Sequence, residues 1–533
     1  GNLADDGAEL TARLCEDEAL RVRFFALLGG STLLGDHLAA HPETWQELTK
    51  PLPEEHEMFQ QMLGSVGAHV ADFAEIESVE DDPASKDLTT PGTYRASVTG
   101  SEAVSALRDA YRTLMLRIAA HDLAGSYFAR KGQSEPQPKL LFSTVTGALS
   151  RLADAALTAA LAVAVAEVYG PYPTDPTENA DDKTSGSHSA TEATQTAART
   201  AAGTGPGARK TTAKKATPVD ARLAVIAMGK CGAQELNYIS DVDVIFVAEP
   251  ASNKATRLAA EFNRIGSAAF FEVDPNLRPE GKSGALVRTL DSHISYYRRW
   301  AETWEFQALL KARAQTGYLP LGRRYEDAIR PMVWTASERD SFVEDVQAMR
   351  RRVLANVPKD MRNRELKLGT GGMRDVEFAV QLLQLVHGRS DERLRVLSTV
   401  EALDALKNAG YIGREDSWQL IEAYEFLRLL EHRLQLQRFR RTHTMPADDD
   451  TEALRWLARA AGFDAHGAKS SYDLMVNHLR KVRLRISELH SRLFYRPLLD
   501  AVASMSAEEL RLSPAAAKLQ LSALGYRHPG RAF

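Results

Sequence analysis

Two aspartates, Asp241 and Asp243, stand one residue apart at the start of an apolar segment that runs from Val242 to Val247. Alternate side chains of a β-strand point to the same face, so a strand here would place both carboxylates side by side. Adjacent carboxylates repel each other unless a cation lies between them, and oxygen ligands suit Mg²⁺ or Mn²⁺. A lone Asp-x-Asp pair also arises in turns and solvated loops. Because an unpaired carboxylate pair in an apolar strand would be costly, we predict that both aspartates bind metal.

Two features near this pair fit chemistry on a phosphate. The apolar run from Leu223 to Met228 predicts a buried strand, and it ends at Gly229 and Lys230. Backbone N–H groups in such a Gly-Lys turn can meet phosphate oxygens. A third carboxylate, Asp274, follows along the chain. Because phosphoryl chemistry with two metal ions commonly uses three carboxylates, we predict that Asp274 joins the metal ligands and the catalytic set.

A loop with two glycines comes directly after this third carboxylate. It runs from Glu280 to Gly284 and contains Lys282 and Ser283. Such a loop can wrap a phosphate, and Arg278 together with Lys282 could neutralise phosphate oxygens. We predict substrate contacts here, and the alternative is an ordinary turn.

Further along, a glycine pair opens a segment, residues 371–388, with a helical pattern. Arg374, Glu377, Gln381 and Gln384 fall on one face of that helix, whereas most other positions are apolar. A polar stripe on an otherwise buried helix must find partners. Two interpretations stay open: the stripe faces an active-site cleft, or it belongs to an internal polar network or a hydrated groove.

Other reactive side chains favour structural roles. His432 has no partner at metal-ligand spacing, and Cys231 has no nearby histidine to activate it as a nucleophile. The basic run of Arg438, Arg440 and Arg441 is typical of a solvated helix end, although it could also meet an acidic substrate surface.

The elements that must position these residues form a small mixed sheet set between two helical regions. Residues 1–90 and the chain after about residue 340 show helical patterns. An amphipathic helix starts at Ser101, a plausible N-cap, and an alanine-rich helix runs roughly from Thr146 to Val168. Residues 174–217 have almost no large apolar side chain, so we predict a disordered insertion there.

The net charge, the cysteine count and the length of the apolar runs exclude several classes of protein. The chain has 533 residues and a net charge of −5, so it lacks the overall positive charge that is typical of nucleic-acid-binding proteins. Only two cysteines occur, which argues against a disulfide framework and fits a cytoplasmic location. No apolar run approaches the roughly 18 residues needed to span a bilayer, so we expect no membrane association.

The motifs together resemble a known family. Gly229 followed after eleven residues by Asp241-x-Asp243 is similar to the signature of the DNA polymerase beta-like nucleotidyltransferase superfamily. The fuller string from Gly229 through Ser240 to Asp243 resembles the bifunctional glutamine synthetase adenylyltransferase/adenylyl-removing enzymes. The strings 304–313 and 366–378 resemble the same family, which often reads Asp-Met-Arg-Leu-Arg-Pro where this chain has Asp-Pro-Asn-Leu-Arg-Pro at 274–279.

This resemblance implies a fold and a set of boundaries. The fold class is α+β and mostly helical, with a small mixed-sheet nucleotidyltransferase core between N-terminal helices and a C-terminal helical bundle. We expect an N-terminal helical region at 1–100, a catalytic domain at 101–345 with the insertion at 174–217, and a helical bundle at 346–500. Residues 501–533 would start a linker or a following helical region.

The resemblance also implies an activity and its participants. It implies removal of AMP from a tyrosine of adenylylated glutamine synthetase by phosphorolysis, with inorganic phosphate and adenine nucleotide as small partners and a PII signal protein as a regulator. Substrate contacts are implied for Ser240, Lys311, Arg313, Arg374 and Glu377, in addition to the residues above. The adenylylating half of the same enzyme, or a regulatory module with a vestigial site, are the alternatives.

Overall fold

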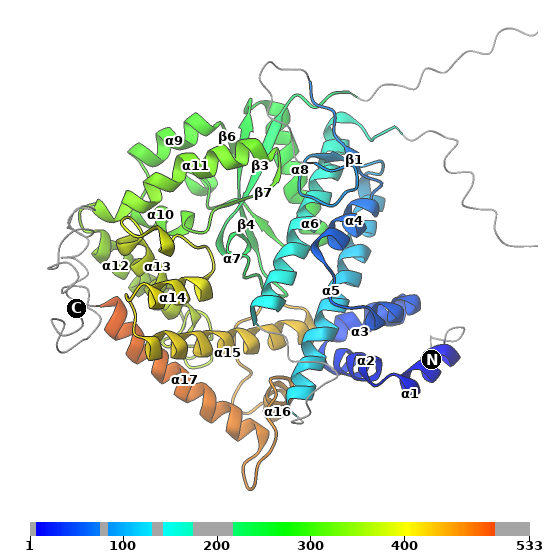
Figure 1. The fold of residues 1–533 in the computed structure, drawn as a ribbon, viewed down its shortest axis with the longest axis vertical. Helices are drawn as coiled ribbons and strands as arrows, with labels where there is room; N and C mark the ends of the chain where they lie inside the picture. Colours follow the sequence, from blue (N-terminus) through cyan, green and yellow to red (C-terminus); the bar gives the residue numbers. More distant parts are fainter. Residues whose placement is uncertain (1–6, 75–83, 131–141, 174–216, 496–533) are drawn as a thin grey trace, which may run out of the picture.

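The computed structural model describes residues 7–74, 84–130, 142–173 and 217–495. Residues 174–216 of the predicted disordered insertion and the whole of 501–533 lie outside the described residues. The chain is mostly helical with a small mixed sheet, so the predicted α+β fold class is confirmed. Figure 1 shows the sheet at the centre, the N-terminal helices along one side of it and the later helices along the other.

The N-terminal helices form one layer. They are α1 (Gly7–Glu16), α2 (Glu18–Gly30), α3 (Thr32–Ala40), the 3₁₀ helix η1 (Pro42–Thr49) and α4 (Glu55–Gly64). Asp17 and Ser31 accept backbone N–H groups at the N-termini of α2 and α3, which explains why the helices break where they do. A two-stranded sheet of β1 (His69–Val70) and β2 (Tyr94–Arg95) follows.

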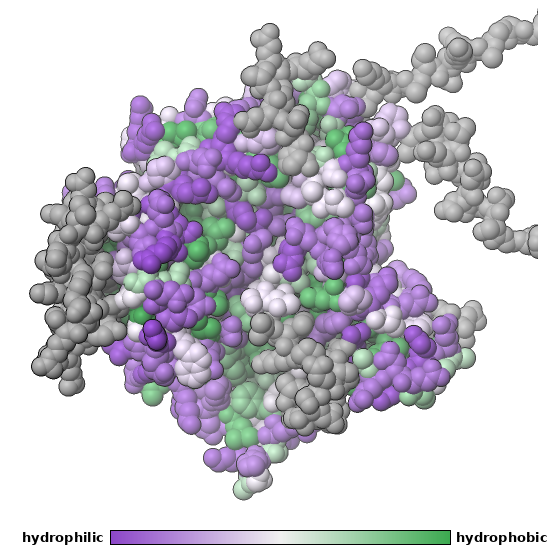
Figure 2. Space-filling model, in the orientation of Figure 1, coloured by the Kyte–Doolittle hydropathy of each residue, from purple (hydrophilic) through white to green (hydrophobic). Residues whose placement is uncertain are grey.

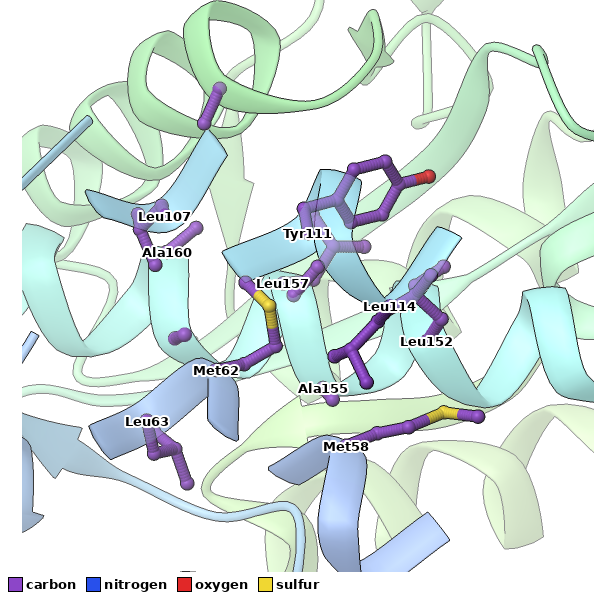
Figure 3. Close-up of a cluster of buried hydrophobic side chains, with 14 of the residues drawn as sticks. Met58, Met62, Leu63, Leu107, Tyr111, Leu114, Leu152, Ala155, Leu157 and Ala160 are labelled. Atoms are coloured by element: carbon purple, nitrogen blue, oxygen red, sulfur yellow. The ribbon is translucent and has the colours of Figure 1, made fainter. Parts of the chain in front are cut away.

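Two long helices, α5 (Gly100–Arg130) and α6 (Phe142–Tyr169), connect this layer to the sheet. The helix predicted to start at Ser101 begins one residue earlier, so Ser101 lies in its first turn rather than at the N-cap. Figure 3 shows how side chains of α4, α5 and α6 interlock, including Met62, Leu107 and Leu157. Burial of these side chains fixes the three helices against each other.

The expectation that no apolar run reaches membrane-spanning length is wrong for α6. This helix is long and apolar enough to cross a bilayer by length and composition, with a mean hydropathy of 1.6 over 18 residues. Leucines, alanines and valines supply that hydropathy, whereas Arg151 and Asp154 interrupt the apolar sequence in the first half of the helix. However, 89% of the apolar window is buried inside the protein, which is the position of a core helix. The face of the molecule shown in Figure 2 is largely hydrophilic.

The central sheet has five strands. They are β3 (Arg222–Ala227), β4 (Val242–Glu249), β5 (Val273–Asp274), β6 (Val287–Arg288) and β7 (Arg313–Gly317). β3 lies between β4 and β7 and is antiparallel to both, whereas β5 and β6 pair in parallel with β4. The two apolar runs predicted to be strands therefore appear as β3 and β4.

Alternation along β4 decides which way the acidic residues face. Val242, Val244 and Phe246 belong to the apolar cluster under α6 and α8 (Asn253–Ala269). Ile245 and Val247 belong to the opposite cluster, which the later helices cover. Because Asp243 shares the parity of Ile245, its carboxylate faces the later helices.

The later helices enclose that face. They are α9 (Leu290–Arg299), α10 (Thr303–Leu309), α11 (Leu319–Thr335), α12 (Phe342–Ala355), α13 (Met373–His387), α14 (Thr399–Asn408), α15 (Arg414–Arg438), α16 (Thr451–Ala460) and α17 (Ser471–Phe494). Short 3₁₀ turns η2 (Gly281–Ser283), η3 (Ala336–Glu338) and η4 (Glu392–Leu394) join some of them. α13 lies among α12, α14, α15 and α17, so nearly all of its residues are buried.

Candidate active site

Three carboxylates meet at the edge of the sheet. Asp243 in β4 lies directly opposite Asp274 in β5, in parallel register, and Asp241 stands just before β4 begins. The Asp274 carboxylate accepts the backbone N–H of Asn276 at 2.8 Å, which fixes the turn after β5. Strand pairing thus brings together Asp243 and Asp274, which are 31 positions apart in the sequence.

The electrostatics of this group fit a cation. Burial, together with the neighbouring carboxylates of Asp241 and Asp274, raises the pKa of the Asp243 carboxyl to about 7. A guanidinium already compensates part of this charge, because Arg441 Nη2 lies 3.0 Å from Asp241 Oδ2. Oxygen-only ligands with excess negative charge are what Mg²⁺ or Mn²⁺ prefers, so the residues present fit a hard divalent ion.

Gly229 brings backbone close to these carboxylates. It opens the single turn α7 (Gly229–Gly232) with a φ of +55°, a conformation that favours glycine. A Cβ at this position would stand 3.0 Å from Asp243 Oδ2. The turn therefore places its backbone against β4, beside the Asp243 carboxylate.

The carboxylates border a cavity of about 300 Å³ between the sheet edge and the later helices. Its wall includes Asp241 and Asp243, four basic side chains and a group of apolar ones. The lining residues are Gly229, Lys230, Ser240, Asp241, Asp243, Leu277, Trp304, Gln307, Ala308, Lys311, Met349, Val353, Lys367, Arg374, Glu377, Phe378 and Gln381. Six of the predicted substrate contacts therefore line this cavity: Gly229, Lys230, Ser240, Lys311, Arg374 and Glu377.

The polar stripe of α13 serves both of the roles left open by the sequence. Arg374, Glu377 and Gln381 line the cavity. Arg374 Nη1 pairs with Glu377 Oε2 at 3.1 Å, and Gln381 accepts from Gln307 of α10 at 2.7 Å. Gln384, one turn further along α13, donates instead to the carbonyl oxygens of Leu394 and Val396 and so belongs to an internal network.

Glu377 carries a fixed negative charge. Burial alone would raise the pKa of this carboxyl, but Arg374, Lys230 and Lys311 outweigh it and lower the pKa to about 2. A carboxylate this acidic is a weak proton acceptor at neutral pH. It is better suited to hold Arg374 in place than to act as a general base.

The basic side chains of the cavity differ in how fully they are engaged. Lys230 pairs with the buried Glu431 at 3.3 Å, and burial lowers the pKa of Lys230 to about 7. Lys311 donates to Thr399 Oγ1 at 2.9 Å. Within the described part of the chain, the amine of Lys367 makes no hydrogen bond or ion pair, although it lines the same cavity. Lys367 is thus the lysine most available to an incoming anion.

Four predicted phosphate contacts do not reach the cavity. Arg278 donates to the carbonyl oxygens of Pro275, Lys282 and Gly284, so its guanidinium fastens the loop 279–284 onto itself. Lys282 and Ser283 are exposed on that loop. A Cβ at Gly284 would stand 2.0 Å from Pro279 O, so this glycine is needed for the turn. The ordinary-turn alternative describes the loop better than a phosphate clamp.

Arg313 also lies outside the cavity. Its guanidinium pairs with Asp154 of α6 at 2.8 Å and donates to Cys231 O at 3.2 Å. It therefore holds the Gly-Lys turn against α6 rather than facing a substrate. Cys231 itself is buried, and burial raises the pKa of its thiol to about 12, in keeping with a structural role.

Several motif residues clamp the catalytic loop to the helices. Glu235 accepts the backbone N–H groups of Thr399 and Val400 at the start of α14. Asn237 accepts from the buried Arg428 of α15. Tyr238 donates to Asp122 of α5 at 2.9 Å, and Arg433 of α15 holds the same carboxylate with two hydrogen bonds. These motif residues therefore have structural partners, and none of them lines the cavity.

Sequence reasoning missed Lys367 as a cavity residue and Glu431 as the partner of Lys230, and it left Arg441 among solvated residues. All three come from segments far along the chain from the Asp-x-Asp pair. Lys367 lies in the string 366–378 that resembled the family, which was the one available signal for it.

Comparisons with known proteins agree with this geometry. A family model described as glutamate-ammonia ligase adenylyltransferase matches residues 191–327, and one described as GlnD PII-uridylyltransferase matches residues 347–494. A Corynebacterium efficiens bifunctional glutamine synthetase adenylyltransferase/adenylyl-removing enzyme is 59% identical over 530 residues. Proteins of the same name from Nocardia farcinica and Mycobacterium bovis are 52% and 48% identical.

The chain belongs to this enzyme family. The predicted resemblance is thereby confirmed. The alignments cover 98% or more of the chain but only 45–46% of these three relatives. The chain thus spans about half the length of the bifunctional adenylyltransferase/adenylyl-removing enzymes it matches.

Proposed function

We propose that this chain is a metal-dependent nucleotidyltransferase that removes AMP from an adenylylated tyrosine of glutamine synthetase by phosphorolysis. The observation that carries the proposal is the cluster of three carboxylates, Asp241, Asp243 and Asp274, beside a cavity with four basic side chains. Such a site suits transfer of a group with a charged phosphate at its centre.

The three aspartates would hold Mg²⁺ or Mn²⁺ in this activity. When bound, the metal supplies charge stabilisation at the phosphorus and at the departing tyrosine oxygen. Asp274 contributes an oxygen from β5, and Asp243 contributes one from β4, so relative motion of the two strands would disturb the site.

The remaining cavity residues bind and orient the substrate. Lys367 and Arg374 meet the attacking phosphate, which needs cations to offset its repulsion from the adenylyl phosphate. Leu277, Trp304 and Phe378 form an apolar wall that fits a nucleobase. Glu431 holds the Lys230 amine, at 3.3 Å, in the wall of the cavity that Gly229 also lines.

Phosphate is the better nucleophile for this cavity than water. A water molecule needs a base to remove its proton, whereas phosphate is already anionic at neutral pH. Among the described residues that line the cavity there is no histidine, Glu377 has a pKa of about 2, and the carboxylates of Asp241 and Asp243 would be occupied by the metal. The phenol of tyrosine, with an ordinary pKa of about 10, is a tolerable leaving group once its negative charge is stabilised.

The test supplies adenylylated glutamine synthetase, Mg²⁺ and inorganic phosphate to the chain and identifies the nucleotide released. Phosphorolysis gives ADP that depends on phosphate, and the Asp241→Asn variant should release none. Phosphate-independent AMP would mean hydrolysis.

Two further arms separate the alternatives. Incorporation of AMP into unmodified glutamine synthetase from ATP would identify the adenylylating activity instead. Turnover in neither direction would favour a regulatory module. Response to a PII signal protein belongs to the same proposal and is measured as a change in the rate of ADP release.

A further inference from the structure

A cluster of metal-binding side chains lies away from the cavity, between α3 and α5. His37 of α3, His41 at the C-cap of α3 and Asp109 of α5 each offer one ligand atom, and these atoms all lie within 4.8 Å of one another. None of the three lines the active-site cavity.

The backbone explains why the two histidines converge. The backbone N–H of His41 donates to the carbonyl oxygen of His37 at 2.9 Å, closing the last turn of α3. Residues four apart on a helix share a face, and the two rings lie in contact with centroids 4.6 Å apart. Packing of α3 on α5 then brings Asp109 to the same place.

We propose that His37, His41 and Asp109 form a binding site for a transition-metal ion of the Zn²⁺ class. Two imidazoles and one carboxylate match the ligand types that Zn²⁺ takes in proteins, and they differ from the oxygen-only set of the catalytic aspartates. The site would therefore select a different metal from the active site.

The distances allow the site to close without moving a helix. Ligand atoms around tetrahedral Zn²⁺ stand about 3.3 Å apart, since each bond is about 2.0–2.1 Å long. His41 is 39% exposed and Asp109 is half-buried, so both side chains can turn toward a common centre. Glu43 Oε1, 3.8 Å from His41 Nδ1, can supply a fourth ligand, and water can do so from the open side.

The surroundings keep the imidazoles ready for a metal. His37 is only 5% exposed, and burial lowers its pKa to about 4, an effect to which His41 and Arg112 add. The neutral ring keeps a lone pair for coordination. Its Nε2 lies 3.5 Å from Thr113 Oγ1, a long contact that orients the ring without strongly engaging it. Arg112 opposes a cation here, whereas Asp109 and Glu43 favour it.

A bound ion would fix the N-terminal helices. It would link α3 to α5, and α3 also reaches α15 through the hydrogen bond from Thr32 Oγ1 to Gln437 O at 2.9 Å. The expected role is a structural clamp, which requires no contact with substrate.

The experiment titrates the full chain with Zn²⁺ against a chromophoric chelator, in millimolar Mg²⁺ that occupies the catalytic carboxylates. We expect one tightly bound Zn²⁺ per chain and a rise in the melting temperature. Co²⁺ in place of Zn²⁺ should give the visible absorption of a low-symmetry site. None of these readouts depends on activity.

Variants distinguish this site from others. His41→Ala and Asp109→Asn, at partly exposed positions that tolerate substitution, should each weaken Zn²⁺ binding at least tenfold and abolish the rise in melting temperature. The matched control is His56→Ala, another exposed histidine beside a glutamate, Glu54, at 3.4 Å; it should bind Zn²⁺ as the unmodified chain does. Equal binding by His41→Ala and His56→Ala, or loss of binding only in Asp243→Asn, would overturn the proposal.

Discussion

Replacing Asp243 with asparagine should stabilise the metal-free protein while destroying the metal site. Asparagine has nearly the same shape as aspartate, so the close approach of Gly229 to this side chain is preserved. What changes is the charge. With metal removed, burial and the adjacent Asp241 and Asp274 make the ionised Asp243 carboxylate unfavourable.

The magnitude follows from the pKa. Folding raises the pKa of Asp243 from 3.8 to about 7. Because each pKa unit corresponds to about 1.4 kcal/mol, the ionised carboxylate costs at most about 4 kcal/mol above pH 7. Relaxation and water penetration reduce such penalties, so we expect the variant to be more stable by about 2–4 kcal/mol at pH 8.

The sign of the pH dependence is opposite to that of a salt-bridged carboxylate. Since the folded state holds the proton more tightly than the unfolded state, the unmodified chain loses stability relative to the variant as pH rises from about 4 to about 7, and the difference is constant above that range. The assay is urea unfolding of both proteins in a chelator between pH 5 and 8.

Added Mg²⁺ provides the control. It should stabilise the unmodified chain, because the ion binds the folded state through the carboxylates, and leave Asp243→Asn little changed. A stability difference that does not vary with pH, or equal stabilisation of both proteins by Mg²⁺, would refute the assignment of Asp243 as a buried metal ligand.

Four further substitutions test the site and the contacts that support it. Asp241→Asn should lower ADP release at least a hundredfold with a stability loss under about 1 kcal/mol, because its partner is an exposed arginine; activity and unfolding assays check this. Lys367→Ala should raise the KM for phosphate, whereas Arg278→Ala should lower the melting temperature with little change in that KM; an equal KM increase in both would contradict the cavity assignment. Arg433→Met removes the positive charge and the two hydrogen bonds that Arg433 gives the buried Asp122 carboxylate and leaves it the one from Tyr238, so urea unfolding should show a loss of about 3–5 kcal/mol, and a loss below 1 kcal/mol would contradict this.

The sequence was most informative where chemistry and secondary structure share one short segment. The parity of the Asp-x-Asp pair and the apolar residues around it predicted a strand with both carboxylates on one face; β4 carries Asp243 in this way, but it begins at Val242, so Asp241 lies just before the strand. The stripe on α13 was recognisable for the same reason, because helical spacing alone places Arg374 and Glu377 together.

Contacts between distant segments could not be predicted in this way. Arg441 reaches Asp241 from 200 positions along the chain, and Glu431 reaches Lys230 from 201 positions. No local pattern distinguishes an arginine that pairs with a catalytic carboxylate from one that meets only solvent. The outcome depends on where α15 ends relative to the sheet.

Phosphate contacts were misassigned for a different reason. The loop from Glu280 to Gly284 has the composition of a phosphate-binding loop, but the guanidinium of Arg278 satisfies its carbonyl oxygens. Composition cannot show whether a basic side chain is already used by its own backbone. Arg313 was misassigned similarly, because its partner Asp154 is contributed by α6.

The motif residues between β3 and β4 connect the candidate active site to the rest of the fold. Glu235 holds the start of α14, Asn237 holds α15 and Tyr238 holds α5, so the turn that carries Gly229 and Lys230 is fastened to three helices. A buried polar network of this kind tolerates little displacement, since each broken contact would leave an unpaired group in the interior. Movement of α14 or α15 would therefore be transmitted to the carboxylates and to Lys230.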